Sequence, residues 1–123
     1  MTAEQKYIQL VVADHLGIRQ DLQLDINDID AVVDFYENDD GDLQDSKEAI
    51  REGECETNIE PSWSRHYESK SVAAQALDGQ WIGWTFWYGG GRHGCPREMG
   101  FDVYDLDCKE EEKWITVRTF TKK

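Results

Sequence analysis

The chain has 123 residues, 39% of them hydrophobic and 11% aromatic, which fits one globular domain and excludes a disordered acidic tail. Its formal net charge is −13 at pH 7, without a basic cluster or an apolar run of about 20 residues, so we expect neither direct nucleic-acid binding nor a membrane span. Three cysteines and no secretory signal at the start lead us to expect reduced thiols and a cytoplasmic protein.

The first half of the chain is predicted to be helical. Apolar residues recur at helical spacing over residues 4–16 and more regularly over residues 26–37, where Asp25 suits the N-cap position. The polar residues 38–45 then predict a loop, and a short helix is expected over residues 46–52.

The second half is predicted to form a sheet. We expect four strands, at residues 65–77, 80–88, 101–107 and 113–121. Asp78-Gly79 is a hairpin signal between the first two strands, and the polar run Asp107 to Glu112 predicts a turn between the last two. Helices followed by strands indicate an α+β fold, with N-terminal helices packed on a C-terminal antiparallel β-sheet of about four strands.

The charge is divided unevenly along what we expect to be a single domain, residues 1–123. The acidic helical part, residues 1–60, carries 17 acidic and 4 basic residues, whereas the β-sheet part, residues 61–123, carries 9 of each. An even spread of charge would serve solubility as well, so the division favours an interaction surface in the first half.

Acidic residues form a stripe along the second predicted helix and beyond it. Asp30 and Asp34 lie one helical turn apart, and repulsion between such a pair costs an isolated helix about 0.2–0.5 kcal/mol. Carboxylates held at this spacing resemble a row of phosphates. The predicted partner-binding residues are Asp28, Asp30, Asp34, Glu37, Asp39, Asp40, Asp42, Asp45, Glu48 and Glu52. A solvated face that keeps the protein soluble is the competing interpretation.

A calcium loop is a weaker alternative for the same region. With Gly41 at the sixth position of an EF-hand loop, the first position is Tyr36 and the twelfth is Lys47, where carboxylates are needed. Only a loose divalent site would remain, so we expect no bound metal and no cofactor.

Residues 87–96, rich in glycine, suggest several further chemistries. Three consecutive glycines beside Arg92 are compatible with a phosphate-binding loop, but no GxxxxGK[ST] pattern follows. His93 and Cys95, with His66, Cys55 and Cys108 elsewhere, are candidates for a metal site or a cysteine nucleophile, although their spacing matches no common module. A wide turn after an aromatic strand explains the same residues without any chemistry.

The aromatic strand at residues 80–88 has large apolar side chains on both faces, where a half-buried sheet needs them on one. This pattern allows two interpretations. Either both faces are covered within the fold, one of them by a second small core under a loop, or one face docks a partner. The second candidate surface consists of Trp81, Trp87, Arg92 and His93.

The segments Glu-Pro-Ser-Trp-Ser-Arg-His-Tyr-Glu at 60–68 and Tyr-Gly-Gly-Gly-Arg-His-Gly at 88–94 resemble small uncharacterised proteins of phages and mobile elements. In size, acidity and lack of a catalytic signature, the chain also resembles phage-encoded DNA-mimic inhibitors of host defence, such as antirestriction and anti-CRISPR proteins. That likeness, one of composition, implies an inhibitor in the host cytoplasm rather than an enzyme.

The resulting hypothesis is an inhibitor whose acidic residues occupy a nucleic-acid-binding surface of a host protein or nuclease complex. An immunity protein or antitoxin that plugs a nuclease would need the same rigid acidic surface. The alternative from another class is a small metal- or cysteine-dependent enzyme built on His66, His93 and Cys95.

Overall fold

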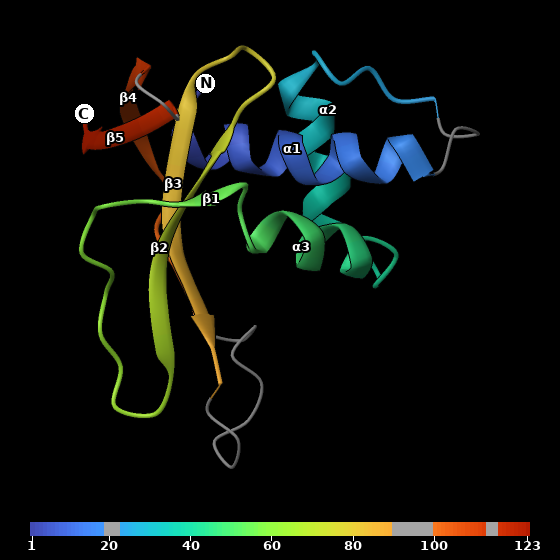
Figure 1. Ribbon diagram of the computed structural model, residues 1–123. Helices are drawn as coiled ribbons and strands as arrows, with labels where there is room; N and C mark the ends of the chain where they lie inside the picture. The colour runs from blue at the N-terminus through green and yellow to red at the C-terminus, as the bar shows by residue number, and fades with distance from the viewer. Residues whose placement is uncertain (19–22, 90–99, 113–115) are drawn as a thin grey trace.

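The computed structural model describes residues 1–18, 23–89, 100–112 and 116–123. Its helices are α1 (Ala3–Ile18), α2 (Ile29–Glu37) and α3 (Gln44–Arg51), and its strands are β1 (Cys55–Glu56), β2 (Glu68–Gln75), β3 (Trp81–Tyr88), β4 (Tyr104–Glu112) and β5 (Thr116–Lys122). The strands form one antiparallel sheet in the order β1-β2-β3-β4-β5, curled into a half-barrel, and the helices pack on one side of it (Figure 1). The predicted α+β fold is confirmed, with one strand more than expected. No helix among the described residues is long and apolar enough to cross a membrane.

The second helix begins later than predicted. Asp28, not Asp25, is its N-cap, and the Asp28 side chain accepts a hydrogen bond from the N–H of Ala31. Asp25 instead begins a turn in which its carbonyl accepts from the N–H of Asp28. The apolar residues before the helix, including Ile26, still pack against α1 and α2, because hydrophobic burial does not require helical geometry.

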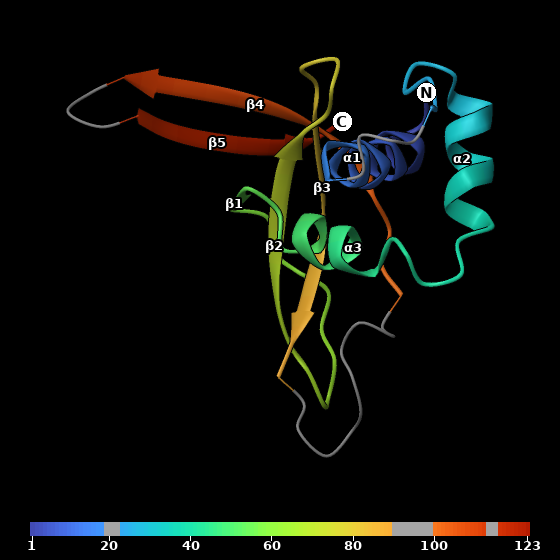
Figure 2. The same ribbon diagram turned by 90° about the vertical axis from the view of Figure 1, so that its right-hand side faces the viewer.

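The last two strands also depart from the prediction. Asp107 to Glu112, expected to turn, belong to β4 and pair with β5 from Leu106↔Lys122 to Glu112↔Thr116. Figure 2 shows this pair as a long hairpin that extends away from the helices. A hairpin that projects in this way satisfies its backbone through pairing alone, so a polar sequence suits it as well as an apolar one.

The main core joins the helices to the sheet. On α1, Tyr7 and Val11 pack against Val72 of β2 and against Ile82 and Trp84 of β3, and all five are buried. A second cluster lies between α1 and α2 around Val12 and Val32.

A third cluster covers the opposite face of the sheet. Ala73, Leu106 and Phe120 are buried there, and Ile59 and Trp81 pack against them. The expectation of a second small core under a loop is therefore confirmed, and it explains why β3 is aromatic on both faces.

Candidate functional site

The helix α2 presents acidic side chains to solvent because its apolar side is used by the core. Val32 is fully buried against Ile8 and Val12 of α1. The remaining sides of the helix carry exposed carboxylates, as do the loop that follows and α3. Eight of the ten predicted partner-binding residues are exposed, and we call them the acidic face: Asp28, Asp30, Asp34, Glu37, Asp40, Asp42, Asp45 and Glu52.

Asp39 differs from its neighbours because its carboxylate points into the fold. Its side chain is only 7% exposed, accepts a hydrogen bond from the N–H of Leu43 at 3.1 Å, and lies 3.5 Å from Nζ of Lys47. Burial alone would raise the pKa of the Asp39 carboxyl, but hydrogen bonds from the N–H groups of Leu43 and Gly41 and the charge of Lys47 outweigh it and lower the pKa. Asp39 therefore fixes the loop before α3, and its carboxylate is less accessible to a partner than those of the acidic face.

Replacing Asp39 with alanine is expected to lower the free energy of unfolding by about 1–2 kcal/mol at neutral pH, because the buried N–H of Leu43 loses its acceptor. Since the pKa of Asp39 is lower in the folded state, its stabilisation is complete above the unfolded pKa of about 3.9 and is lost as the pH falls through the folded value. The difference in unfolding free energy between variant and parent should therefore shrink below about pH 4. Urea titrations followed by circular dichroism across pH 3–7 measure it.

Asp42 provides the matched control, because it lies in the same loop and is exposed. Its replacement with alanine should change stability by less than about 0.5 kcal/mol. Equal losses for the two variants at pH 7 would contradict the structural role of Asp39.

The two basic residues of α3 are also held by the fold. Nη1 of Arg51 lies 3.6 Å from Oε2 of Glu48, and the guanidinium stacks on Phe86 with its central carbon 4.7 Å from the ring centre. Arg51 also donates a hydrogen bond to the carbonyl of Trp87. Lys47 forms an ion pair with Asp39, so neither of these two cations pairs with the carboxylates of the acidic face.

The second predicted surface is not an open docking face in the part of the chain that the structure describes. Trp81 is half-buried, with its ring centre 5.2 Å from that of Phe120, and Arg118 stacks on it at 5.4 Å. Trp87 is only 5% exposed, so it offers little surface to a partner. Arg92 and His93 lie outside the described residues.

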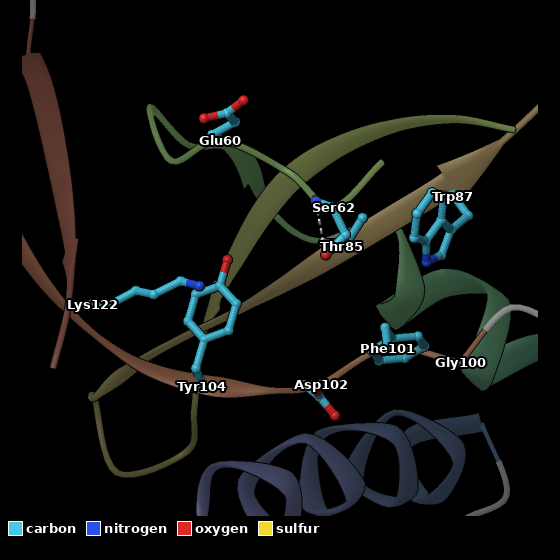
Figure 3. Close-up of a pocket in the computed structure, with 9 residues that line it drawn as sticks. All are labelled: Glu60, Ser62, Thr85, Trp87, Gly100, Phe101, Asp102, Tyr104 and Lys122. Carbon is cyan, nitrogen blue, oxygen red and sulfur yellow. Dashed lines mark hydrogen bonds between the residues drawn. The ribbon is translucent and has the colours of Figure 1, made fainter. Parts of the chain in front are cut away.

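A cavity of about 510 Å³ lies beside β3, and no pattern in the sequence predicted it (Figure 3). We call it the sheet-edge cavity. Its walls include Thr85 and Trp87 of β3, Asp102 just before β4, Tyr104 at the start of β4, Glu60 from the loop before β2, and Lys122 of β5. Burial raises the pKa of the Tyr104 hydroxyl above its ordinary value of about 10. Only the alternation of β3 could have indicated in advance that Thr85 and Trp87 share a face.

The metal and thiol hypotheses receive no geometric support from the described ranges. Within them, no three His, Cys, Asp or Glu side chains lie close enough together to hold a metal ion. Burial raises the pKa of the Cys55 thiol, although the nearby charge of Arg118 acts in the opposite direction. The raised pKa disfavours the reactive thiolate. His66 is exposed, whereas the predicted His93 and Cys95 lie outside the described residues.

The loop around Gly41 is held by contacts within the protein. Gly41 adopts a left-handed backbone with φ of 118°, which allows the chain to turn, and Asp39 and Lys47 pair across that turn. The residue at the twelfth EF-hand position thus supplies a cation to the loop where a bidentate carboxylate would be required.

Neither models of protein families, nor curated proteins, nor solved structures gave a match to this chain.

Proposed function

We propose that the acidic face occupies a basic, nucleic-acid-binding surface of a host protein and thereby inhibits it. One observation carries the proposal: no described cation forms an ion pair with any of the eight exposed carboxylates, whereas Lys47 and Arg51 are paired with Asp39 and Glu48. An acidic surface that served stability would mix the two signs of charge. The unpaired carboxylates are instead available to the lysines and arginines with which a protein neutralises phosphates.

The scaffold holds these carboxylates in place before any partner arrives. Leu43, between the two acidic helices, is fully buried, and Asp39 accepts a hydrogen bond from its N–H group. Ser46 of α3 and Val32 of α2 are buried as well, so both helices are fixed against the core. Acidic groups fixed in this way lose little conformational entropy on binding, which a merely solubilising face would not need.

A pull-down from host-cell lysate with and without competing double-stranded DNA tests the proposal. The protein is expected to capture a nucleic-acid-binding protein that DNA displaces, and added salt should weaken the capture. Reversing one turn of the acidic face, Asp30→Lys with Asp34→Lys, should reduce capture at least about tenfold, because like charges then face the partner.

The matched control is Glu56→Lys with Glu68→Lys, two exposed acids outside the acidic face. This pair changes the net charge equally and should leave capture unchanged. Equal effects of the two double variants would mean that only overall charge matters, and the proposal would then be abandoned. A captured partner that DNA does not displace would also contradict it.

An immunity protein directed at a nuclease would use the same acidic face. Identification of the captured protein by mass spectrometry distinguishes the two, because an immunity protein captures a nuclease encoded beside it and a defence inhibitor captures a host enzyme.

A further inference from the structure

A second, smaller cavity lies where α1 and α2 meet the chain that leads into β4. We call it the Tyr36 pocket; it has a volume of about 250 Å³, and its walls include Tyr36 of α2 and Phe101. Tyr7 and Ile8 of α1 form its floor, because both side chains are almost fully buried, and Glu4 of the same helix lies at its rim with an exposed side chain. In Figure 2 the chain that carries Phe101 is drawn in orange and passes beside α1.

The size and the place of the Tyr36 pocket suit one side chain of a partner protein. Sites for drug-sized ligands measure about 300–1,000 Å³, and this pocket is smaller. Glu37, the residue that follows Tyr36 in α2, belongs to the acidic face. A partner that covers the acidic face would therefore lie beside the mouth of the pocket.

The charge of the Tyr36 pocket favours a cation. Glu4 is the only charged residue among the described residues that line it, and no described cation lies at ion-pair distance from its carboxylate. Burial raises the pKa of the Tyr36 hydroxyl, and the nearby charges of Glu4 and Asp39 raise it further. The Glu4 carboxylate thus lies near enough to Tyr36 to act on a group bound against that ring.

The aromatic walls favour a planar cation. The Tyr36 ring already attracts one cation, because Nζ of Lys47 lies 4.9 Å from its centre. Lys47 lines the neighbouring cavity beside α3 and is paired with Asp39, so it does not fill the Tyr36 pocket. Phe101 packs edge-on against Tyr7, with ring centres 5.4 Å apart, and remains partly exposed. Guanidinium groups are planar and weakly hydrated, so they stack on such rings better than ammonium groups do.

We propose that the Tyr36 pocket receives one arginine side chain of the partner that the acidic face binds. The guanidinium lies against the rings of Tyr36 and Phe101 and donates hydrogen bonds to the Glu4 carboxylate. This inference rests on the proposed function, because surfaces that bind nucleic acids are rich in arginine. An arginine inserted into an aromatic pocket is also typical of the few residues that dominate the affinity of an interface.

Nuclear magnetic resonance titrations of the full chain with N-acetyl-arginine amide test the pocket without any partner. A single side chain offers few contacts, so we expect a Kd of about 1 mM and a shift of the Tyr36 ring signal. N-acetyl-citrulline amide has the same shape without the charge and should bind at least about fivefold more weakly. N-acetyl-lysine amide should also bind more weakly than the arginine probe, because its ammonium group is neither planar nor weakly hydrated.

Two variants locate the contacts. Glu4→Gln keeps the size of the exposed rim residue and removes its charge, so it should weaken the arginine probe about fivefold and leave the citrulline probe unchanged. Tyr36→Leu, which identifies the Tyr36 ring signal, removes one aromatic wall and should weaken the arginine probe by a similar factor. The matched control is Glu56→Gln, at an exposed acid outside the pocket and the acidic face, which should bind the arginine probe like the parent.

Equal affinities for the arginine and citrulline probes would overturn the inference. So would an affinity for the arginine probe that Glu4→Gln leaves unchanged, or binding that does not shift the Tyr36 ring signal. Tighter binding of the lysine probe would contradict the assignment to arginine.

The pull-down from host-cell lysate separates a failure of this inference from a failure of the proposed function. When a partner that DNA displaces is captured, Glu4→Gln should reduce the capture about fivefold and Glu56→Gln should not. Capture that Glu4→Gln leaves unchanged would overturn the arginine contact alone. Specific binding of the arginine probe, without any partner that DNA displaces, would overturn the proposed function and leave the arginine site in place.

Discussion

Replacing Trp84 with alanine is expected to remove about 3–5 kcal/mol of the free energy of unfolding, which is a large part of the total of about 5–15 kcal/mol for a domain. Trp84 is fully buried in the main core, and its ring meets Tyr7 edge-on with centres 4.9 Å apart. Its indole N–H also donates to the carbonyl of Arg51, which ties α3 to β3. The variant therefore opens a cavity and frees a helix end, and urea unfolding followed by circular dichroism measures the loss.

Trp63→Ala is the control, because that tryptophan is 83% exposed. We expect it to change the unfolding free energy by less than about 0.5 kcal/mol. A loss below about 1 kcal/mol for Trp84→Ala would contradict the packing of α1 and α3 on β3, because removing a buried, well-packed tryptophan side chain costs more than that.

The sequence was most informative where one physical requirement dominates. The regular apolar spacing of α2 predicted a helix, and the aromatic run predicted β3, because burying those side chains requires those periods. The start of α2 was missed because Asp25 and Asp28 are equally good caps by residue type. The choice between them depends on where the chain turns after Leu24 has packed against α1 and α2.

The β4–β5 hairpin was missed in part because composition is a poor guide to a projecting ribbon. The run from Asp107 to Glu112 has the polarity of a turn, yet its backbone pairs with β5 residue by residue. The composition of those residues does not reveal that they pair with β5, and it is this pairing that stabilises them as a strand.

The two candidate sites also differ in how far the sequence could predict them. The density of acidic residues could be counted in advance, but Asp39 could not be separated from Asp40 or Asp42 without the position of the Leu43 N–H. The sheet-edge cavity was beyond reach, because Glu60, Thr85 and Lys122 meet only after the sheet has curled.

Gly83 is the position where that curl is most sensitive to substitution, and Gly83→Ala is expected to lower the unfolding free energy by about 1–3 kcal/mol. A β-carbon there would lie 2.7 Å from Cδ1 of Leu106, 2.9 Å from Cε2 of Tyr104 and 3.2 Å from the carbonyl oxygen of Val72. These contacts come from both neighbouring strands, so the methyl group cannot be accommodated by moving one side chain alone. Thermal and urea unfolding of the variant measure the effect.

Gly17→Ala makes the same chemical change where the structure has room, because nothing lies within 4 Å of a β-carbon at that position in α1. The alanine should raise the unfolding free energy by up to about 1 kcal/mol, since it restricts the unfolded chain and favours the helix. If Gly83→Ala lowers the unfolding free energy and Gly17→Ala raises it, the loss at Gly83 is due to the close approach of β4 to β3. If Gly83→Ala were as stable as the parent, Leu106 and Tyr104 would have to shift freely. The three-residue pairing would then not be what holds β4 against β3.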